Sequence, residues 1–191
     1  FLSQGKKPEQ IAETMRTLTA KVEKSPVKED AVLFAASAEL RLKHWENAIN
    51  LFQQYLKVAP QRQPFADIAR LGVINAMLSS GDPQQFSNAR QLISQYLNEV
   101  TDPVIKEKLQ IAAVVACLLT NQREQAMTYL NAMKASKEES AGKMLAESLL
   151  TLIPQIPDNE LKELANKFPP SLLLPPPAED KAGKAEKPGK K

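Results

Sequence analysis

Hydrophobic residues recur every three or four positions along most of the chain, which is the spacing of one face of an α-helix. The pattern is clearest from Trp45 to Pro60, where a proline ends the run because it cannot continue a helix. Asp158 is the predicted N-cap of a short helix near the end of the pattern. The spacing predicts longer helices before it, over residues 8–23, 29–43, 45–60, 64–79, 87–100, 104–120, 123–135 and 138–153.

The predicted helices form pairs, and the second helix of each pair carries an alanine in an equivalent place. The segment Trp45-x-x-Ala48-x-x-Leu51-x-x-x-Tyr55 is matched by Phe86-x-x-Ala89-x-x-Leu92-x-x-x-Tyr96. Looser copies contain Ala12 and Ala126, so the alanines at 12, 48, 89 and 126 are 36, 41 and 37 residues apart. The longest spacing predicts an inserted loop over residues 81–88. A single pair cannot bury its apolar face, whereas stacked pairs can.

These residues resemble the tetratricopeptide repeat family, in degenerate copies that cover about residues 1–153. The resemblance rests on the alanines, on the aromatic residue three positions earlier, on the prolines that end the units and on Leu71-Gly72 in a first helix. The aromatic residue that the family places late in the first helix is missing, and Glu39, Asn75 and Cys117 stand near that position. The resemblance implies an all-α fold, a right-handed α-solenoid of stacked antiparallel helix pairs, although related helical-hairpin repeats give a similar pattern.

The domain expected from this pattern covers residues 1–168. Its units are about 1–26, 29–60, 64–103 and 104–136, and capping helices over 138–168 should give the array a polar end. Residues 169–191 are rich first in proline and then in lysine, alanine, glycine and glutamate, so we expect a disordered tail. Phe1-Leu2 resembles the end of a first helix, which predicts that the chain is the C-terminal part of a longer protein.

Composition and charge exclude few classes of function. Hydrophobic residues make up 43% of the chain and charged residues 25%, which is ordinary for a globular protein. The net charge of +3 comes largely from the tail, so nucleic acid is not a favoured partner. No apolar run is long enough for a transmembrane segment. The single cysteine favours a cytoplasmic protein, and a periplasmic or membrane-anchored one remains open because the N-terminus looks truncated.

Residues with catalytic chemistry are sparse. His44 is the only histidine and is expected in a surface turn, while Cys117 lies in an apolar run and is expected in the core. No phosphate-binding loop, catalytic triad or metal-binding motif is recognisable. The sequence therefore predicts a protein that is not an enzyme and that holds no cofactor or metal.

The resemblance implies a binding surface in the concave groove, which the first helix of each pair lines. That groove should take an apolar or helical segment of a partner protein, unless the chain's own residues 172–174 fill it. The residues predicted to line it are Leu33, Ser37, Leu40, Arg41, Val73, Met77, Lys108, Ile111, Val115 and Leu118. The residues predicted to pack the repeats together are Trp45, Ala48, Tyr55, Phe86, Ala89, Tyr96 and Ala126.

The function expected from the sequence is protein–protein interaction, as an adaptor or scaffold. One alternative is a scaffold subunit of a ribonucleoprotein or protein-translocation complex, whose basic tail would contact RNA or an anionic membrane. A second alternative is the soluble repeat region of a membrane-anchored envelope protein. The sequence identifies no partner for any of these.

Overall fold

The computed structural model describes residues 9–10, 13–14, 17, 28–136 and 139–168, and all regular structure within them is helical. This confirms the all-α prediction. The predicted truncated N-terminus and the tail over 169–191 lie outside the described residues, as does most of the predicted helix over 8–23. The helices are α2 (Lys28–Arg41), α3 (Trp45–Val58), α4 (Phe65–Ser79), α5 (Pro83–Glu99), α6 (Pro103–Leu119), α7 (Arg123–Lys134), α8 (Ala141–Leu152) and α9 (Leu161–Asn166), with 3₁₀ turns at Ile153–Gln155 and Asp158–Glu160.

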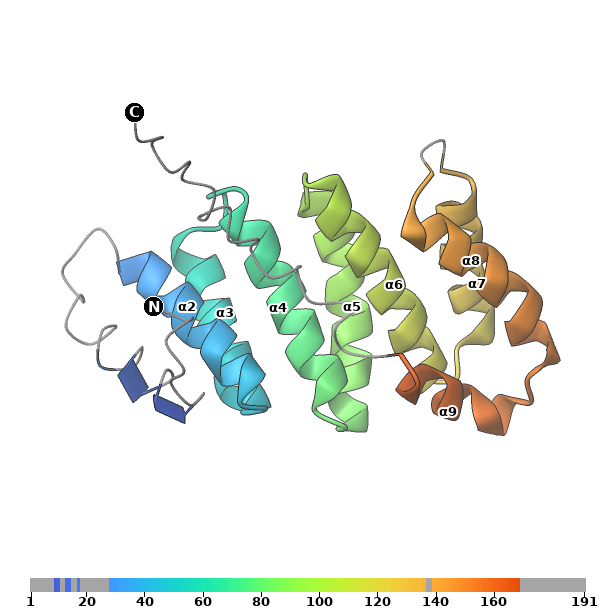
Figure 1. Ribbon diagram of the computed structural model, residues 1–191, viewed down its shortest axis with the longest axis horizontal. Coiled ribbons are helices and arrows are strands. Elements are labelled where there is room, and N and C mark those ends of the chain that lie inside the picture. The colour runs from blue at the N-terminus through green and yellow to red at the C-terminus, as the bar shows by residue number, and fades with distance from the viewer. Residues whose placement is uncertain (1–8, 11–12, 15–16, 18–27, 137–138, 169–191) are drawn as a thin grey trace, which may run out of the picture.

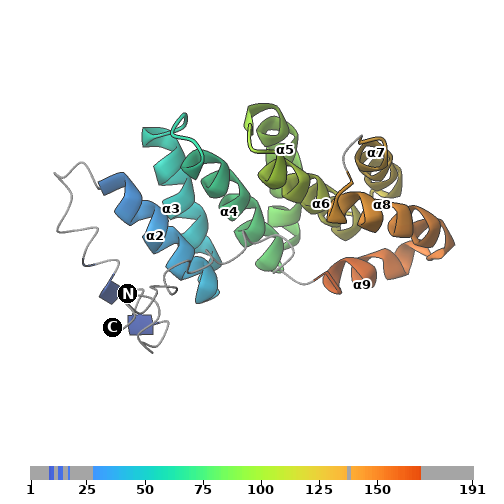
Figure 2. The same ribbon diagram turned by 45° about the horizontal axis from the view of Figure 1, so that its top comes forward.

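The helices are arranged in two layers, and each of α2 to α8 packs on its neighbours in sequence (Figure 1). Helices α2, α4, α6 and α8 form one layer, here called the front layer, and α3, α5 and α7 form the layer behind it (Figures 1 and 2). Consecutive helices of the front layer also contact one another directly. Helix α9 turns back and packs on α6 rather than chiefly on α8, which precedes it.

Several helices begin where a side chain caps the free backbone amides of the first turn. The carboxylate Oδ1 of Asp102 accepts hydrogen bonds from the amides of Val104 (2.8 Å) and Ile105 (3.0 Å). A proline follows Asp102 at the first helical position, where the missing N–H has no intrahelical role. Asp82 and Pro83 start α5 in the same way, and the Ser140 hydroxyl caps α8.

The predicted inserted loop over residues 81–88 is wrong, because α5 begins at Pro83. Asp82 and Pro83 form a helix start that outweighs the polar composition of the residues after them. The extra residues of the long repeat therefore lengthen α5 on the N-terminal side of Ala89. Gly81 lies in the turn before α5 and has a φ of +76°. A left-handed φ of this kind favours glycine, which has no Cβ.

Two boundaries at the C-terminal end also differ from the prediction. Helix α8 begins at Ala141 instead of at residue 138, since Ser140 is the residue whose side chain caps it. Asp158 does not cap a helix with its side chain. Its carboxylate instead accepts a hydrogen bond from Nε of Arg123 on α7 at 3.0 Å. The Asp158 carboxylate, which the local pattern predicted as a helix cap, therefore binds an arginine that is distant in the sequence.

The turn between α2 and α3 has the same backbone geometry as the turn between α6 and α7. Lys43 and Asn121 occupy equivalent places and have left-handed φ angles of 63° and 58°. The amide after each donates to a carbonyl five residues earlier, from His44 to Glu39 at 3.0 Å and from Gln122 to Cys117 at 2.7 Å. Helices α2 and α6 therefore end in the same kind of turn, a common way for a helix to end.

A close helix contact joins α3 to α4, where the Phe52 ring lies against Gly72. Phe52 is 1% exposed, and a Cβ built on Gly72 would come within 2.5 Å of its ring. The alanines that define the repeat, Ala48, Ala89 and Ala126, are fully buried. Small residues thus stand at enclosed positions of these helices, where a larger side chain would have to displace its neighbours.

The close contact predicts that Gly72→Ala destabilises the protein. Overpacking a filled core costs about 1–3 kcal/mol, and the better helix propensity of alanine returns up to roughly 1 kcal/mol. We expect a net fall of about 1–2 kcal/mol in the free energy of unfolding, measured by urea denaturation. Phe52→Leu should lessen the loss, so the double variant should lose less stability than the two single losses added together. Additive losses would show that the Phe52 ring is not what restricts this position.

Candidate functional site

The predicted groove residues lie on the helices of the front layer, and most of their side chains are enclosed. Ser37, Leu40 and Lys108 are half-buried and Arg41 is exposed. The others are buried, namely Leu33, Val73, Met77, Ile111, Val115 and Leu118. The accessible part of the predicted groove is therefore the C-terminal half of α2, together with Lys108 near the start of α6.

Helices α4 and α6 are enclosed because other helices contact them on several sides. Helix α4 contacts α2, α3, α5 and α6, and α6 contacts α4, α5, α7, α8 and α9. Every residue of α6 from 111 to 119 is buried. Leu161 and Ala165 bury the apolar side of α9, which packs on α6. A helix that is apolar on all sides is usually buried, so the apolar sequence of residues 111–119 already indicated that this part of α6 is enclosed.

The residues predicted to pack the repeats are divided in the structure. Ala48, Tyr55, Ala89, Tyr96 and Ala126 are buried. Burial raises the pKa of the Tyr55 phenol, and it does the same for Tyr96, where the nearby charge of Glu99 adds to the effect. Trp45 and Phe86 are only half-buried. The aromatic positions near the starts of α3 and α5 are therefore partly exposed to solvent.

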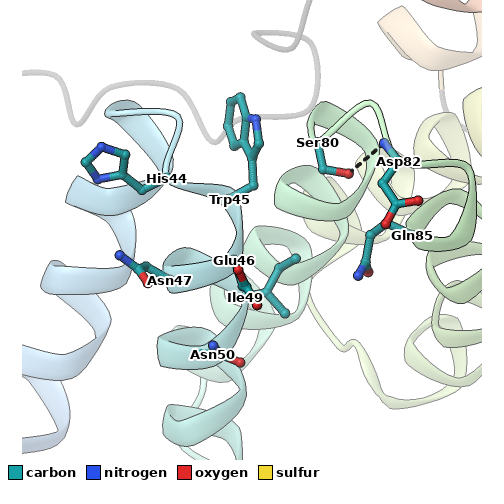
Figure 3. A pocket seen from close by; sticks show the side chains of 9 residues that line it. All are labelled: His44, Trp45, Glu46, Asn47, Ile49, Asn50, Ser80, Asp82 and Gln85. Atoms are coloured by element: carbon teal, nitrogen blue, oxygen red, sulfur yellow. Dashed lines mark hydrogen bonds between the residues drawn. The ribbon is translucent and has the colours of Figure 1, made fainter.

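Trp45 lines an open cleft, here called the Trp45 cleft. It has a volume of about 730 Å³ and lies between the first turns of α3 and the α4–α5 turn (Figure 3). Ile49 points toward the α4–α5 turn, whereas His44 and Asn47 are turned toward α2. The cleft is lined by His44, Trp45, Glu46, Asn47, Ile49, Asn50, Ser80, Asp82 and Gln85.

His44 lies in an exposed turn, as predicted, but it has a partner that the sequence did not reveal. Its Nδ1 lies 2.8 Å from Oε2 of Glu39, a carboxylate only 1% exposed. The Asn47 amide donates to the same oxygen at 3.4 Å. Glu39 precedes His44 by five residues, across the end of α2, so the turn and not helical periodicity brings them together. The contact ties the end of α2 to the start of α3.

A second polar cluster is buried between α4 and the loops on either side of it. Asp67 accepts hydrogen bonds from the amides of Thr101 (3.0 Å) and Asp102 (3.1 Å) and pairs with Arg70 at 3.1 Å. Arg70 also pairs with Glu99 at 2.8 Å and donates to the carbonyl of Pro60 at 3.1 Å. These contacts already satisfy the guanidinium, so its role is to fix the loops rather than to bind a ligand.

Cys117 is buried in α6, which confirms the prediction of a core residue. Its Sγ lies 3.9 Å from Oε1 of Gln125, and burial raises the pKa of the thiol to about 11. The thiolate is the reactive form of cysteine. A thiol with this pKa is almost entirely protonated near neutral pH and is a poor nucleophile.

In the part of the chain that the structure describes, no three His, Cys, Asp or Glu side chains are grouped so as to hold a metal ion. None of the described helices combines the length and the apolarity that crossing a membrane requires. Comparisons with protein-family models, with curated proteins and with solved structures found no match. The arrangement of the described residues is therefore the basis for assigning a function.

The burial of Cys117 predicts that its thiol reacts slowly in the folded protein. At pH 8 about one thiol in a thousand is ionised when the pKa is about 11. An aromatic disulfide reagent should release its chromophore slowly in buffer and quickly in urea, with Cys117→Ser as the blank. Because folding raises this pKa above its unfolded value of about 8.5, the thiol's contribution to stability is complete below that pH and is lost as the pH rises toward 11. Equally fast reaction in buffer and in urea would contradict this burial.

Proposed function

We propose that the chain is a non-catalytic protein-interaction module, an adaptor or scaffold built as a right-handed, tetratricopeptide-like solenoid. The observation that carries the proposal is the stacking of helix pairs, in which consecutive helices of the front layer contact one another directly. An array of this kind grows in one direction and presents long surfaces rather than a single enclosed cavity.

The proposed partner surface is the accessible end of the front layer, formed by Ser37, Leu40 and Arg41 on α2. Leu40 supplies apolar contact area, and the exposed Arg41 beside it offers hydrogen-bond donors at the rim. The Ser37 hydroxyl is already bonded to the Leu33 carbonyl at 3.0 Å. A helical or extended apolar segment of a partner protein is complementary to a surface that combines an apolar side chain with a charged one.

This proposal predicts that Leu40→Glu leaves the protein folded and weakens partner capture. The immobilised 191-residue chain would be exposed to an extract of its source organism, and captured proteins would be identified by mass spectrometry. We expect the variant to keep the helical circular dichroism of the wild type and to capture roughly tenfold less partner, because a buried charge opposes apolar contact.

Val58→Glu is the matched control, because Val58 is an exposed apolar residue on α3, in the layer behind. It should leave capture unchanged. Leu118→Glu and Ala48→Trp are unsuitable as binding variants, since both side chains are fully buried and either change should unfold the protein. If the Leu40→Glu variant captured as much partner as the wild type does, α2 would not be the contact surface. Failure of the wild-type chain to capture any protein would contradict the proposed function itself.

A further inference from the structure

We propose that the Trp45 cleft binds a lysine or arginine side chain presented by a segment of a partner protein. This inference rests on the proposed protein-interaction function, and it adds to the α2 surface a second contact site with a stated partner chemistry. The cleft has a volume of about 730 Å³, within the usual range of ligand sites. Its walls come from segments far apart in the sequence, residues 44–50 of the α3 start and residues 80–85 of the α4–α5 turn (Figure 3).

The charge of the lining favours a cation. Among the described residues that line the cleft, Glu46 and Asp82 are carboxylates, and there is no lysine or arginine. Glu46 stands in the first turn of α3, and Asp82 stands at the start of α5 on the opposite wall. Asp82 uses Oδ1 to accept the Gln84 amide at 2.9 Å, which leaves Oδ2 to face an incoming charge. A carboxylate on each wall attracts a cationic group and repels an anionic one.

The apolar part of the lining suits the stem of such a side chain. Trp45 is half-buried, so part of its side chain remains accessible. A tryptophan face attracts ammonium and guanidinium groups through its ring electrons. Ile49 lies one helical turn further along α3 and lines the same cleft. Lysine and arginine bury their methylene stems on apolar surface while the charged group stays near polar atoms.

The cleft also contains a hydrogen-bond acceptor that has no partner. The Oε1 atom of Gln85 is buried and accepts no hydrogen bond from the described residues. A buried acceptor without a donor is unfavourable, since it has lost its contact with water. Rotation of the Gln85 amide would bring this oxygen to the surface of the cleft, where an ammonium or a guanidinium group could donate to it. An apolar side chain could not.

The third helix pair shows that a chain segment can occupy this place in the repeat. Arg123 begins α7 as Trp45 begins α3, and it donates to the carbonyls of Ile153 and Ile156. It also pairs with the Asp158 carboxylate at 2.6 Å. There the helix supplies the cation and the segment supplies the carboxylate. At the start of α3 a neutral Trp45 stands in place of the arginine and the first-turn carboxylate of Glu46 is kept, so a segment bound there would supply the cation itself.

The test uses the indole of Trp45, because it is the only tryptophan in the chain. The probe is a capped peptide of glycine and serine with one central arginine, and the comparison peptide has glutamate in its place. Titration of the arginine peptide should shift the indole N–H signal and the tryptophan fluorescence in a saturable way, with a dissociation constant of roughly 0.1–5 mM. The shift should weaken as salt is raised. The glutamate peptide should produce none.

The double variant Glu46→Gln/Asp82→Asn should raise the dissociation constant for the arginine peptide roughly tenfold. Asparagine caps a helix as well as aspartate does, so α5 should still form. The control is Glu124→Gln, which removes the equivalent first-turn carboxylate from α7 and should leave peptide binding unchanged.

Three results would overturn the assignment: no shift with the arginine peptide up to roughly 10 mM, equal shifts with both peptides, or undiminished binding by the double variant. The partner-capture experiment separates this inference from the proposed function. If the double variant captures a partner protein as strongly as the wild type does, the Trp45 cleft is not the site and the proposed function stands. If the wild-type chain captures nothing, the proposed function fails.

Discussion

The packing of Phe52 against Gly72 is the contact on which the arrangement of the helix pairs depends. The ring occupies the space that any other residue at position 72 would fill with its Cβ. Helices α3 and α4 can therefore approach closely, and α4 can contact α2 and α6 within its own layer. Filling this space would push two pairs apart and would loosen contacts well beyond the substituted residue, because a close-packed interior transmits strain.

Buried polar contacts fix the orientation of the loops once the apolar faces have packed. Asp67 and Arg70 connect α4 to the loop before α6 and to Pro60 before α4. Near the other end, the Glu107 carboxylate accepts the Gly142 amide at 2.7 Å and so ties α6 to the first turn of α8. Removing one member of such a group leaves a buried polar atom or charge without compensation, which is far less favourable than an exposed one.

Much of the helical fold could be predicted from the sequence, because caps, prolines and periodicity are local signals. The predicted start at residue 104 lies one residue from the observed start of α6 at Pro103, and the apolar run through Cys117 correctly indicated the core. The predicted helix boundaries were wrong where a second interaction or a second helix signal acted on the same residues. The Asp82-Pro83 start extended α5 into a predicted loop, and Arg123 engaged the carboxylate of Asp158.

The candidate site was harder to predict, because long-range packing forms it. Trp45 was expected to pack between repeats, and the structure places it on an open cleft with residues 80–85. No periodicity links those two segments. Long-range packing also explains why predicted groove residues such as Val73 and Leu118 are buried, because several helices contact α4 and α6 from different sides.

The central claim is that each helix pair is held mainly by its neighbours in a linear stack. Hydrogen exchange measured by mass spectrometry on wild type and on Gly72→Ala tests this directly, because it reports local opening along the chain. A stack predicts faster exchange in α2, α3 and α4 and little change in α7 and α8, which lie farther along the array. An equal increase in exchange over all of these helices would show a single cooperative core and would contradict the claim.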